Sequence, residues 1–459
     1  MVVRAVPHTA RRPSRPLSPV APSRVRDHHV GRAVGVYAAV VMGMWTQHGG
    51  LTALTHGPVA AARAVAQLSG LAAASLGLAG LVLVARPRAV ERRYGLDRML
   101  NWHRVFGESM AVLVAVHTVA AVTAWRVDGD WSTAVADLTG DEPYMAAATV
   151  GAAIIGVVTI TSLRSIRRRL AYETWWFLHL TAYVGLALSF AHQIGTGTDF
   201  ATHDVARTAW VGLHLTVLAA VLWGRWGRVV VSVARPLRVR RIRDAGGGVH
   251  EVTLHGRRLQ RLRASPGQFF FLRPLTGDGW WRCNPFSLSA APTTDELRFS
   301  IKACGDATRA ITSLPVGARV AVDGPYGTCT PEVADDRRLL FVVGGVGVAP
   351  ARAMLQDLPI DSRPIVLYRA RTRADLVHVE ELVSLADRRG GDVLVLVGPS
   401  SMFAGHDPFD ARELRSAVPD VADRVAVLCG PNGMLMAARS GLRGAGVPDE
   451  RIHFERPWW

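Results

Sequence analysis

Lysine is nearly absent from this chain: Lys302 is the only one, and arginine supplies the rest of the 53 basic residues. Acidic residues number only 37, which leaves a formal net charge of +16. A charge of that size is compatible with nucleic-acid binding. The arginines, however, lie beside long apolar runs, as positive charge does around membrane spans. We therefore exclude a nucleic-acid partner and expect contact with anionic membrane lipid.

Cysteine is scarce as well, with four residues in a chain of 459, and all four lie in its second half: Cys283, Cys304, Cys329 and Cys429. Scattered cysteines in a reducing compartment are free thiols more often than bridges, so a fold built on disulfides is excluded. No small-residue cleavage site follows the first apolar run, so a cleavable signal peptide is not expected.

Six apolar runs of about membrane-spanning length fill the first half, at 33–48, 66–85, 103–124, 144–163, 174–194 and 207–224. A helix that crosses a bilayer needs ~20 such residues, and the first run is the weakest of the six. Arginine gathers before the first run, in the second and fourth connections, and after the sixth run, whereas the other connections are mainly acidic. This asymmetry predicts a multi-pass protein of the cell membrane with both termini in the cytoplasm.

Composition divides the chain into four segments. Residues 1–32, rich in Arg, Pro and Ser, are predicted to be a disordered basic cytoplasmic arm. Residues 33–226 are predicted to form a six-helix transmembrane bundle. Short strands with Gly and Pro turns at 229–332, the first of them at 229–242, predict an antiparallel β-barrel. Strands that alternate with helices at 336–459 predict a parallel α/β nucleotide-binding domain.

Four histidines are placed in pairs on two of the apolar runs. His103 and His117 are fourteen positions apart and His179 and His192 thirteen apart, or roughly 21 and 19.5 Å along a helix. The two runs point the same way, so His103 faces His179 at one depth and His117 faces His192 at another. Two facing imidazoles suit a six-coordinate haem iron, whereas zinc needs three or four ligands at one point. The alternative is that each histidine only hydrogen-bonds within the bundle.

A glycine cluster, GGVGVAP at 344–350, stands between a predicted strand and a predicted helix. Glycines there let backbone N–H groups approach a pyrophosphate at the helix N-terminus. Taken alone, the cluster is also compatible with an ordinary tight turn. It has company, however: RCNPFSLSA, IKACGDATRAI and VDGPYG precede it, and CGPNGM and the aromatic tail HFERPWW follow it.

HRVFGESMAVLVAVH and HLTAYVGLALSFAH resemble the bis-histidine core of the ferric reductase and NADPH oxidase superfamily, and the later segments resemble, in their order, ferredoxin reductase-like flavoproteins. The resemblance covers essentially everything after the N-terminal arm. It implies an NAD(P)H-dependent transmembrane oxidoreductase with FAD and two b-type haems. The acceptor outside the membrane would be oxygen, giving superoxide, or a ferric chelate. The alternative is a membrane-anchored flavoprotein reductase that serves a cytoplasmic or quinone partner.

The resemblance also implies site residues. The haem ligands are His103, His117, His179 and His192. The flavin contacts are Pro285, Phe286 against the flavin, Ser287 bonded to its ring, and Ser289. The segment that holds the FAD pyrophosphate contains Lys302, Gly305, Asp306 and Thr308. The nucleotide turn contains Gly344, Gly345, Gly347 and Pro350, and the edge of the nicotinamide pocket is formed by Cys429, Gly430 and Pro431.

Three further features bear on cofactor binding. Asn284 stands where the family carries His or Arg, and Arg282, two positions earlier, is expected to supply the missing positive charge. Arg369 and Arg371 are expected to follow the second parallel strand, where a 2′-phosphate lies, which favours NADPH over NADH; the alternative is an arginine-rich loop without a ligand. A C-terminal aromatic covers the flavin in the family, so Trp458 is the candidate lid, with Trp459 second. Cys429 and Trp458 are the two residues predicted to be catalytic.

Overall fold

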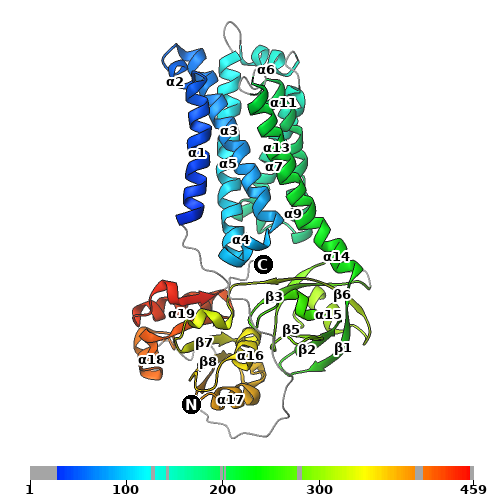
Figure 1. The fold of residues 1–459 in the computed structure, drawn as a ribbon, viewed down its shortest axis with the longest axis vertical. Coiled ribbons are helices and arrows are strands. Elements are labelled where there is room, and N and C mark those ends of the chain that lie inside the picture. The colour runs from blue at the N-terminus through cyan, green and yellow to red at the C-terminus, as the bar shows by residue number, and fades with distance from the viewer. Residues whose placement is uncertain are drawn as a thin grey trace. The chain divides into compact units, whose positions relative to one another are not determined.

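The computed structural model describes residues 28–125, 130–140, 144–196, 200, 203–276, 282–398 and 407–454. The chain folds as two compact units. Among the described residues, one unit holds 28–87 and 98–226, and the other holds 88–97 and those between 227 and 454. Figure 1 shows the fold, with many of the helices and strands labelled.

The first unit is built of helices that run side by side as a bundle (Figure 1). They are α1 (His28–Gln47), α2 (Gly50–Ala53), α3 (Pro58–Ala85), α5 (Leu96–Trp125), α6 (Trp131–Gly140), α7 (Met145–Ser162), α8 (Arg164–Arg167), α9 (Tyr172–Leu180), α10 (Ala182–Leu188), α11 (Phe190–Gly195), α13 (Asp204–Val221) and the π-helix η1 (Leu222–Gly227).

Among the described residues, five helical segments are long and apolar enough to cross a membrane: Pro58–Ala85, Leu96–Trp125, Met145–Ser162, Tyr172–Gly195 and Asp204–Ala234. They correspond to the second to the sixth of the predicted runs. The first predicted run lies in α1, which is helical but is not one of the five. The number of six spans is therefore not confirmed, whereas a multi-pass membrane protein is supported.

Small residues let helices of the bundle approach closely. A Cβ atom on Gly151 of α7 would lie 2.7 Å from the Gly185 carbonyl oxygen of α10. A Cβ on Gly224 of η1 would lie 2.1 Å from the carbonyl oxygen of Ala85, at the end of α3. Close backbone approach at glycines is typical of helix packing in membranes, where apolar contact with lipid already satisfies the larger side chains.

The second unit contains a six-stranded sheet in the order β4-β3-β6-β1-β2-β5, with every pair antiparallel. Its strands are β1 (Leu237–Asp244), β2 (Val249–His255), β3 (Phe269–Pro274), β4 (Asn284–Ser287), β5 (Glu296–Lys302) and β6 (Arg319–Tyr326). A bridge between Leu288 and Phe299 links the chain after β4 to β5, the strand at the other end of that order. The core of this sheet includes Leu254, Phe270 and Phe299, and α15 (Asp306–Thr312) packs on it through Ile311.

The predicted strand at 229–242 is wrong in its first half. Residues Arg228–Ala234 form the helix α14, which continues the last helical segment, and β1 begins only at Leu237. Pro236 explains the change, because a proline disfavours helical backbone at the residue before it, and Arg235 accordingly leaves the helical region with φ −128°. The short helix α4 (Arg88–Tyr94) also belongs to this unit, since Glu91 accepts a hydrogen bond from the Gly327 amide at 2.8 Å.

The same unit contains a five-stranded parallel sheet in the order β11-β10-β7-β8-β9. Its strands are β7 (Leu339–Gly344), β8 (Ile365–Ala370), β9 (Asp392–Val397), β10 (Val425–Cys429) and β11 (Ile452–Phe454), and its helices are α16 (Val348–Asp357), α17 (Val379–Asp387), α18 (Ala411–Ala417) and α19 (Asn432–Gly444). Phe341 and Val343 pack with α16 and α17, whereas Leu340 and Val342 pack with α18 and α19. Successive strand residues face opposite sides, so helices cover both faces, and the predicted parallel α/β layer is confirmed.

Candidate functional site

The four predicted histidines come together in two pairs inside the helical unit. The rings of His103 and His179 have centroids 5.9 Å apart, and those of His117 and His192 are 6.1 Å apart. One ring of each pair comes from α5, and the other comes from α9 or α11. The pairing predicted from sequence spacing is therefore present in the fold.

The fifth predicted run is interrupted between His179 and His192, which are thirteen positions apart. The run is divided at Thr181 and Ser189, both of which lie between His179 and His192. The hydroxyl of Thr181 donates to the Leu178 carbonyl at 2.7 Å, and that of Ser189 donates to the Gly185 carbonyl at 2.9 Å. Such hydroxyl bonds to the preceding turn often bend helices. They alter the helix between the histidines, so both rings can face partners on α5.

Hydrogen bonds to the second ring nitrogen orient three of the histidines. His117 Nδ1 lies 2.8 Å from the Ala66 carbonyl, and His103 Nδ1 lies 3.2 Å from the Gly80 carbonyl. A carbonyl only accepts, so Nδ1 carries the proton in both rings and Nε2 has a free lone pair. His179 Nδ1 lies 3.4 Å from the Ser162 hydroxyl. This is the arrangement of imidazoles that coordinate a metal through Nε2.

A glycine on α3 makes room for one of these rings. A Cβ on Gly70 would lie 2.8 Å from His117 Nδ1, closer than real Cβ contacts, whereas a Cβ on Gly80 would lie 3.5 Å from His103 Nδ1, an ordinary contact. Gly70 could not be identified from the sequence. The only available signal was a glycine within an apolar run that also holds many other small residues.

The donor set fits a haem iron at each level. Two opposite metal–nitrogen bonds of ~2 Å separate the nitrogens by ~4 Å, and ring centroids lie farther out by the radius of each ring. The observed 5.9 and 6.1 Å match this requirement. Within the described part of the chain, no group of three or more His, Cys, Asp or Glu side chains could hold a metal ion. Two imidazoles per level therefore suit an iron whose other four ligands are not protein groups.

Trp175 contacts His179 from the same helix. Its ring stacks on His179 with centroids 5.0 Å apart and planes at 23°, and its Nε1 donates to the Ser162 hydroxyl at 3.3 Å. The guanidinium of Arg167 lies 4.4 Å from the centroid of the Trp175 ring. Sequence reasoning missed Trp175 and Ser162, because neither residue type marks a ligand-orienting role by itself.

The predicted FAD residues divide into two groups. Arg282, Asn284 and Asp306 line a cavity of about 460 Å³ between β4 and α15. Guanidinium and amide groups are suitable donors to pyrophosphate oxygens, so this wall fits the phosphates of FAD. Arg282 and Asn284 share the cavity, as expected if Arg282 supplies the charge that the family places at position 284.

Three residues expected at the FAD pyrophosphate have other partners. Lys302 does not line the cavity, and its Nζ lies 3.2 Å from Asp375 Oδ1. The Thr308 hydroxyl accepts from the Gly305 amide at 2.9 Å, which builds the first turn of α15. Lys302, Gly305 and Thr308 thus have protein partners, and their place at the FAD pyrophosphate stays a prediction.

The proposed flavin segment lies on β4 and just beyond it. Pro285, Phe286 and Ser287 pair with β3, with Phe286 opposite Phe270, and all three are half-buried. The Ser289 hydroxyl is buried and has no hydrogen-bond partner within the described chain. A buried hydroxyl without a partner is unfavourable, so a ligand atom beside it would satisfy this group. The segment therefore fits a flavin.

The glycine turn and the Cys429 segment lie against each other at the ends of β7 and β10. A Cβ on Gly347 would lie 2.4 Å from the Cys429 carbonyl oxygen, and one on Gly430 would lie 3.2 Å from the Gly344 amide nitrogen. Gly345 has φ +55°, which favours glycine. Pro350 is buried in the first turn of α16, and Pro431 directly precedes α19. The two predicted segments thus form one edge of the parallel sheet, where nucleotides bind in open α/β folds.

Tyr368 holds the glycine turn from the neighbouring strand. Its hydroxyl donates to the Gly345 carbonyl at 3.2 Å and accepts from the Val377 amide at 3.0 Å. Burial raises the pKa of Tyr368 to about 12, so the hydroxyl keeps its proton at neutral pH.

The two arginines expected at the 2′-phosphate differ in position. Arg369 lies within β8, not after it, and its Nη1 donates to the carbonyls of Ala370 and Leu396. Burial and then the neighbouring Arg371 lower the pKa of Arg369. Arg371 follows the strand and is exposed. Of the two, Arg371 is therefore the one placed at the strand end as predicted. Trp458 and Trp459 lie outside the described residues.

Comparison with known proteins gives two family matches. The family described as "Ferric reductase like transmembrane component" matches residues 69–190, which include His103, His117 and His179. The family described as "FAD-binding domain" matches residues 248–330, which include the flavin segment and the cavity wall at Asn284 and Asp306. These matches support an oxidoreductase with a membrane part and an FAD-binding part.

Individual relatives match part of the chain. The chain is 31% identical over 201 residues to the ferredoxin reductase component of 3-ketosteroid-9-alpha-monooxygenase from Mycolicibacterium smegmatis, covering 42% of this chain and 56% of that protein. It is 31% identical over 190 residues to ferredoxin--NADP reductase B of Sorangium cellulosum, covering 37% and 76%. A solved structure, "Ferredoxin reductase in carbazole 1,9a-dioxygenase", has 24% identity, a TM-score of 0.41, and coverage of 48% and 68%. The chain spans about half the length of most of these curated relatives. Binding of FAD and NAD(P)H is supported by the match to the FAD-binding family and by the two curated reductases.

Proposed function

Because this chain belongs to the ferric reductase and NADPH oxidase superfamily, we propose that it passes electrons from NADPH through FAD and two b-type haems to an acceptor outside the membrane. The observation that carries the proposal is the presence of two facing histidine pairs in one helical unit, with ring centroids 5.9 and 6.1 Å apart. A bundle that served only as an anchor would need no such pairs.

The cofactors supply the electron chemistry: FAD, when bound, takes two electrons as a hydride from NADPH and passes them singly to haem iron, which accepts one at a time. The chain's own residues bind and orient these groups. His103 and His179 would hold the inner haem, and His117 and His192 would hold the outer haem. Arg282 would place positive charge against the FAD phosphates, and Phe286 and Ser287 would contact the flavin.

The distribution of arginine sets the proposed direction. The connections after the second and fourth predicted runs are rich in arginine, as is the segment after the sixth. We take these as the cytoplasmic side, which puts both termini and the nucleotide-binding half in the cytoplasm, with the inner pair nearest to it. Arg371, exposed after β8, favours NADPH, although NADH is open to the same turn.

Vesicles with a sealed acceptor test the proposal. The full chain, loaded with FAD and haem, is reconstituted into liposomes that enclose ferricyanide, and NADPH is added outside. Neither reagent crosses the bilayer, so reduction of the enclosed ferricyanide requires electron transfer through the protein. We expect reduction in wild-type vesicles. If the enclosed ferricyanide stays oxidised while ferricyanide added on the NADPH side in a second sample is reduced, the protein is not a transmembrane oxidoreductase.

That second outcome would favour the alternative function, a membrane-anchored reductase serving a cytoplasmic or quinone partner. The individual relatives favour this alternative in one respect, because three of them are named as reductases or reductase components. For the transmembrane function, the acceptor is oxygen or a ferric chelate. Superoxide formation and ferric chelate reduction, each measured outside the vesicle with NADPH inside, separate the two.

A further inference from the structure

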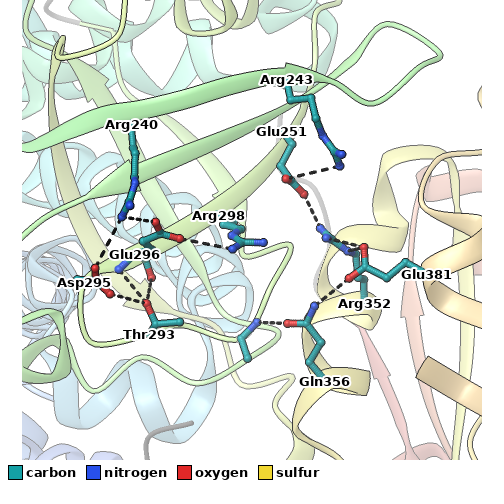
Figure 2. Close-up of polar contacts among 11 residues, drawn as sticks. Arg240, Arg243, Glu251, Thr293, Asp295, Glu296, Arg298, Arg352, Gln356 and Glu381 are labelled. Carbon is teal, nitrogen blue, oxygen red and sulfur yellow. Dashed lines mark hydrogen bonds and ion pairs between the residues drawn. The ribbon is translucent and has the colours of Figure 1, made fainter. Parts of the chain in front are cut away.

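A buried arginine joins the two sheets of the second unit. Arg352 lies on α16, the helix that begins directly after the glycine turn, and only 2% of it is exposed. Its Nη1 donates to Glu251 Oε2 of β2 at 2.8 Å and to the Ser289 carbonyl at 2.9 Å. On its other side, Nε and Nη2 lie 2.9 and 2.7 Å from Glu381 Oε2 of α17. Figure 2 shows Arg352 between Glu251 and Glu381.

A second side chain on α16 bonds the chain just beyond Ser289. Gln356 lies one turn after Arg352, and its Oε1 accepts from the Ala291 amide at 2.8 Å. Its Nε2 donates to Glu381 Oε1 at 3.2 Å, so Arg352 and Gln356 share the carboxylate of α17 (Figure 2). The helix that follows the nucleotide turn is therefore bonded to residues 289–291, which begin with the last residue of the flavin segment.

The charges of this network argue for a geometric role. Glu251 is only 2% exposed. Burial alone would raise its pKa, but the neighbouring Arg352 holds the pKa of Glu251 below its ordinary value. A buried ion pair adds little net stability, because removing both charges from water opposes their attraction. The planar fork of an arginine does fix the direction of several hydrogen bonds at once. Arg352 is thus better suited to setting a geometry than to adding stability.

We propose that Arg352 is a positioning residue that holds the flavin segment and the nucleotide turn at the separation needed for hydride transfer; this rests on the proposed function. Ser289 is three positions from Phe286, and Arg352 is five from Gly347. In this hydride transfer, the C4–H bond of NADPH breaks, and the hydride with its electron pair forms a bond to flavin N5. NADPH is thereby oxidised and FAD is reduced by the same two electrons. A displacement of ~1 Å between reacting groups can lower a rate about 100-fold.

Arg352→Lys tests the geometry, because it keeps the positive charge beside Glu251 but removes the fork. Arg424→Lys is the matched control. Arg424 is similarly buried, at 4% exposure, and bonds Asp420 and the carbonyls of Leu339 and Arg363. All these partners lie in the parallel-sheet part of the unit, so Arg424 does not join the two sheets.

The first measurement needs no nucleotide. Amide hydrogen exchange of the full chain, followed in peptides that cover 285–291, should be on the order of 10-fold faster in Arg352→Lys, because the bonds to the Ser289 carbonyl and its neighbourhood are weakened. Arg424→Lys should match the wild type in these peptides. Exchange at the wild-type rate in Arg352→Lys would overturn the proposal.

The second measurement is flavin reduction by NADPH in a stopped-flow instrument. In Arg352→Lys the limiting rate should fall on the order of 10-fold or more, while the Kd for NADPH and flavin reduction by dithionite stay at wild-type values. A wild-type rate, or a loss confined to NADPH affinity, would contradict the positioning role. If Arg352→Lys fails to fold, Glu251→Gln is used instead, because it keeps the shape of the side chain at 251 and leaves Arg352 in place. It should show the same pattern with a smaller loss, and wild-type behaviour there would contradict the proposal equally.

The two measurements distinguish a failure of the proposed function from a failure of the role proposed for Arg352. If NADPH does not reduce the flavin of the wild-type chain, the proposed function is wrong. Faster exchange at 285–291 in Arg352→Lys would still support the contact between the two segments. If the wild type is reduced and the variant matches it in rate and exchange, only the role of Arg352 is rejected.

Discussion

The rings of His103 and His179 face each other with centroids 5.9 Å apart and planes at 80°. His117 and His192 form a similar pair, with ring centroids 6.1 Å apart and planes at 44°. Both pairs lie in the same helical unit, and each brings two imidazole rings together. Electron transfer across a membrane requires such a series of sites, and loss of one pair should interrupt it without disturbing the flavin.

His192→Leu should therefore remove one of the two haems and abolish transfer to an acceptor across the membrane. Oxidation of NADPH by a soluble dye on the cytoplasmic side should continue, because the flavin half is a separate unit. Haem content and the two activities are measured on the same preparation. His214→Leu is the control, since His214 on α13 bonds the Trp210 carbonyl and belongs to neither pair. Equal loss of both activities in folded His192→Leu would count against this account.

Gly70→Ala should have a similar effect from the opposite helix. The new Cβ would lie 2.8 Å from His117 Nδ1, so the ring must shift away from its bond to the Ala66 carbonyl. We expect a protein that keeps the inner haem and loses or weakens the outer one, measured as haem per chain. Gly107→Ala on α5 is the matched control, because its Cβ meets no atom within 4 Å. A full complement of two haems in Gly70→Ala would show that this contact does not restrict the ligand.

Arg371→Ala combined with Arg369→Ala should raise the KM for NADPH more than the KM for NADH. A charge-assisted contact to a phosphate contributes ~1.5–3 kcal/mol, or roughly a 10-fold to 150-fold effect. Most of it should come from Arg371, since the Arg369 guanidinium already donates to two backbone carbonyls. Arg388→Ala, an exposed arginine after α17, is the control. Equal changes in both KM values would mean that the pair only shapes the loop.

Acid should destabilise the flavin and nucleotide half through His378. Burial, and then Arg352, lower the pKa of His378 to about 4; Glu251, Glu381 and Arg243 also face it. Between pH 6.5 and 4 the unfolded chain binds a proton there that the folded chain does not, so stability falls as pH drops through this range. His378→Asn should flatten that dependence, and asparagine tolerates the local φ of +59°. The thermal midpoint at pH 7 and pH 5, followed by flavin fluorescence, measures it; an unchanged difference would exclude His378 as the source.

The spacing of the histidines and the alternation of strands with helices predicted much of the fold. The histidine pairs could be predicted because a helix fixes the distance and face of residues thirteen or fourteen positions apart. The parallel strands could be predicted because each is a short apolar run followed by a turn or a helix. The helix α14 could not be predicted, because residues 229–233 are rich in valine, which favours strands. Only their position directly after an apolar helix indicates a helix.

Other features depend on contacts that no local pattern records. Arg352 is one arginine in a chain rich in arginine, and its role arises from Glu251, 101 positions away. Gly70 acquires its importance only because His117 packs on it. Lys302 was expected at a phosphate, but the fold places Asp375 within 3.2 Å of it. Long-range packing decided each of these cases.

The absorbance spectrum of the purified full chain, reduced minus oxidised, tests the central claim most directly when it is combined with haem and protein assays. The account predicts two b-type haems per chain, both of which NADPH reduces once FAD is bound, and one of which His192→Leu removes. A folded wild-type chain that binds FAD but contains no haem, or whose haem content is unchanged in His192→Leu, would contradict it.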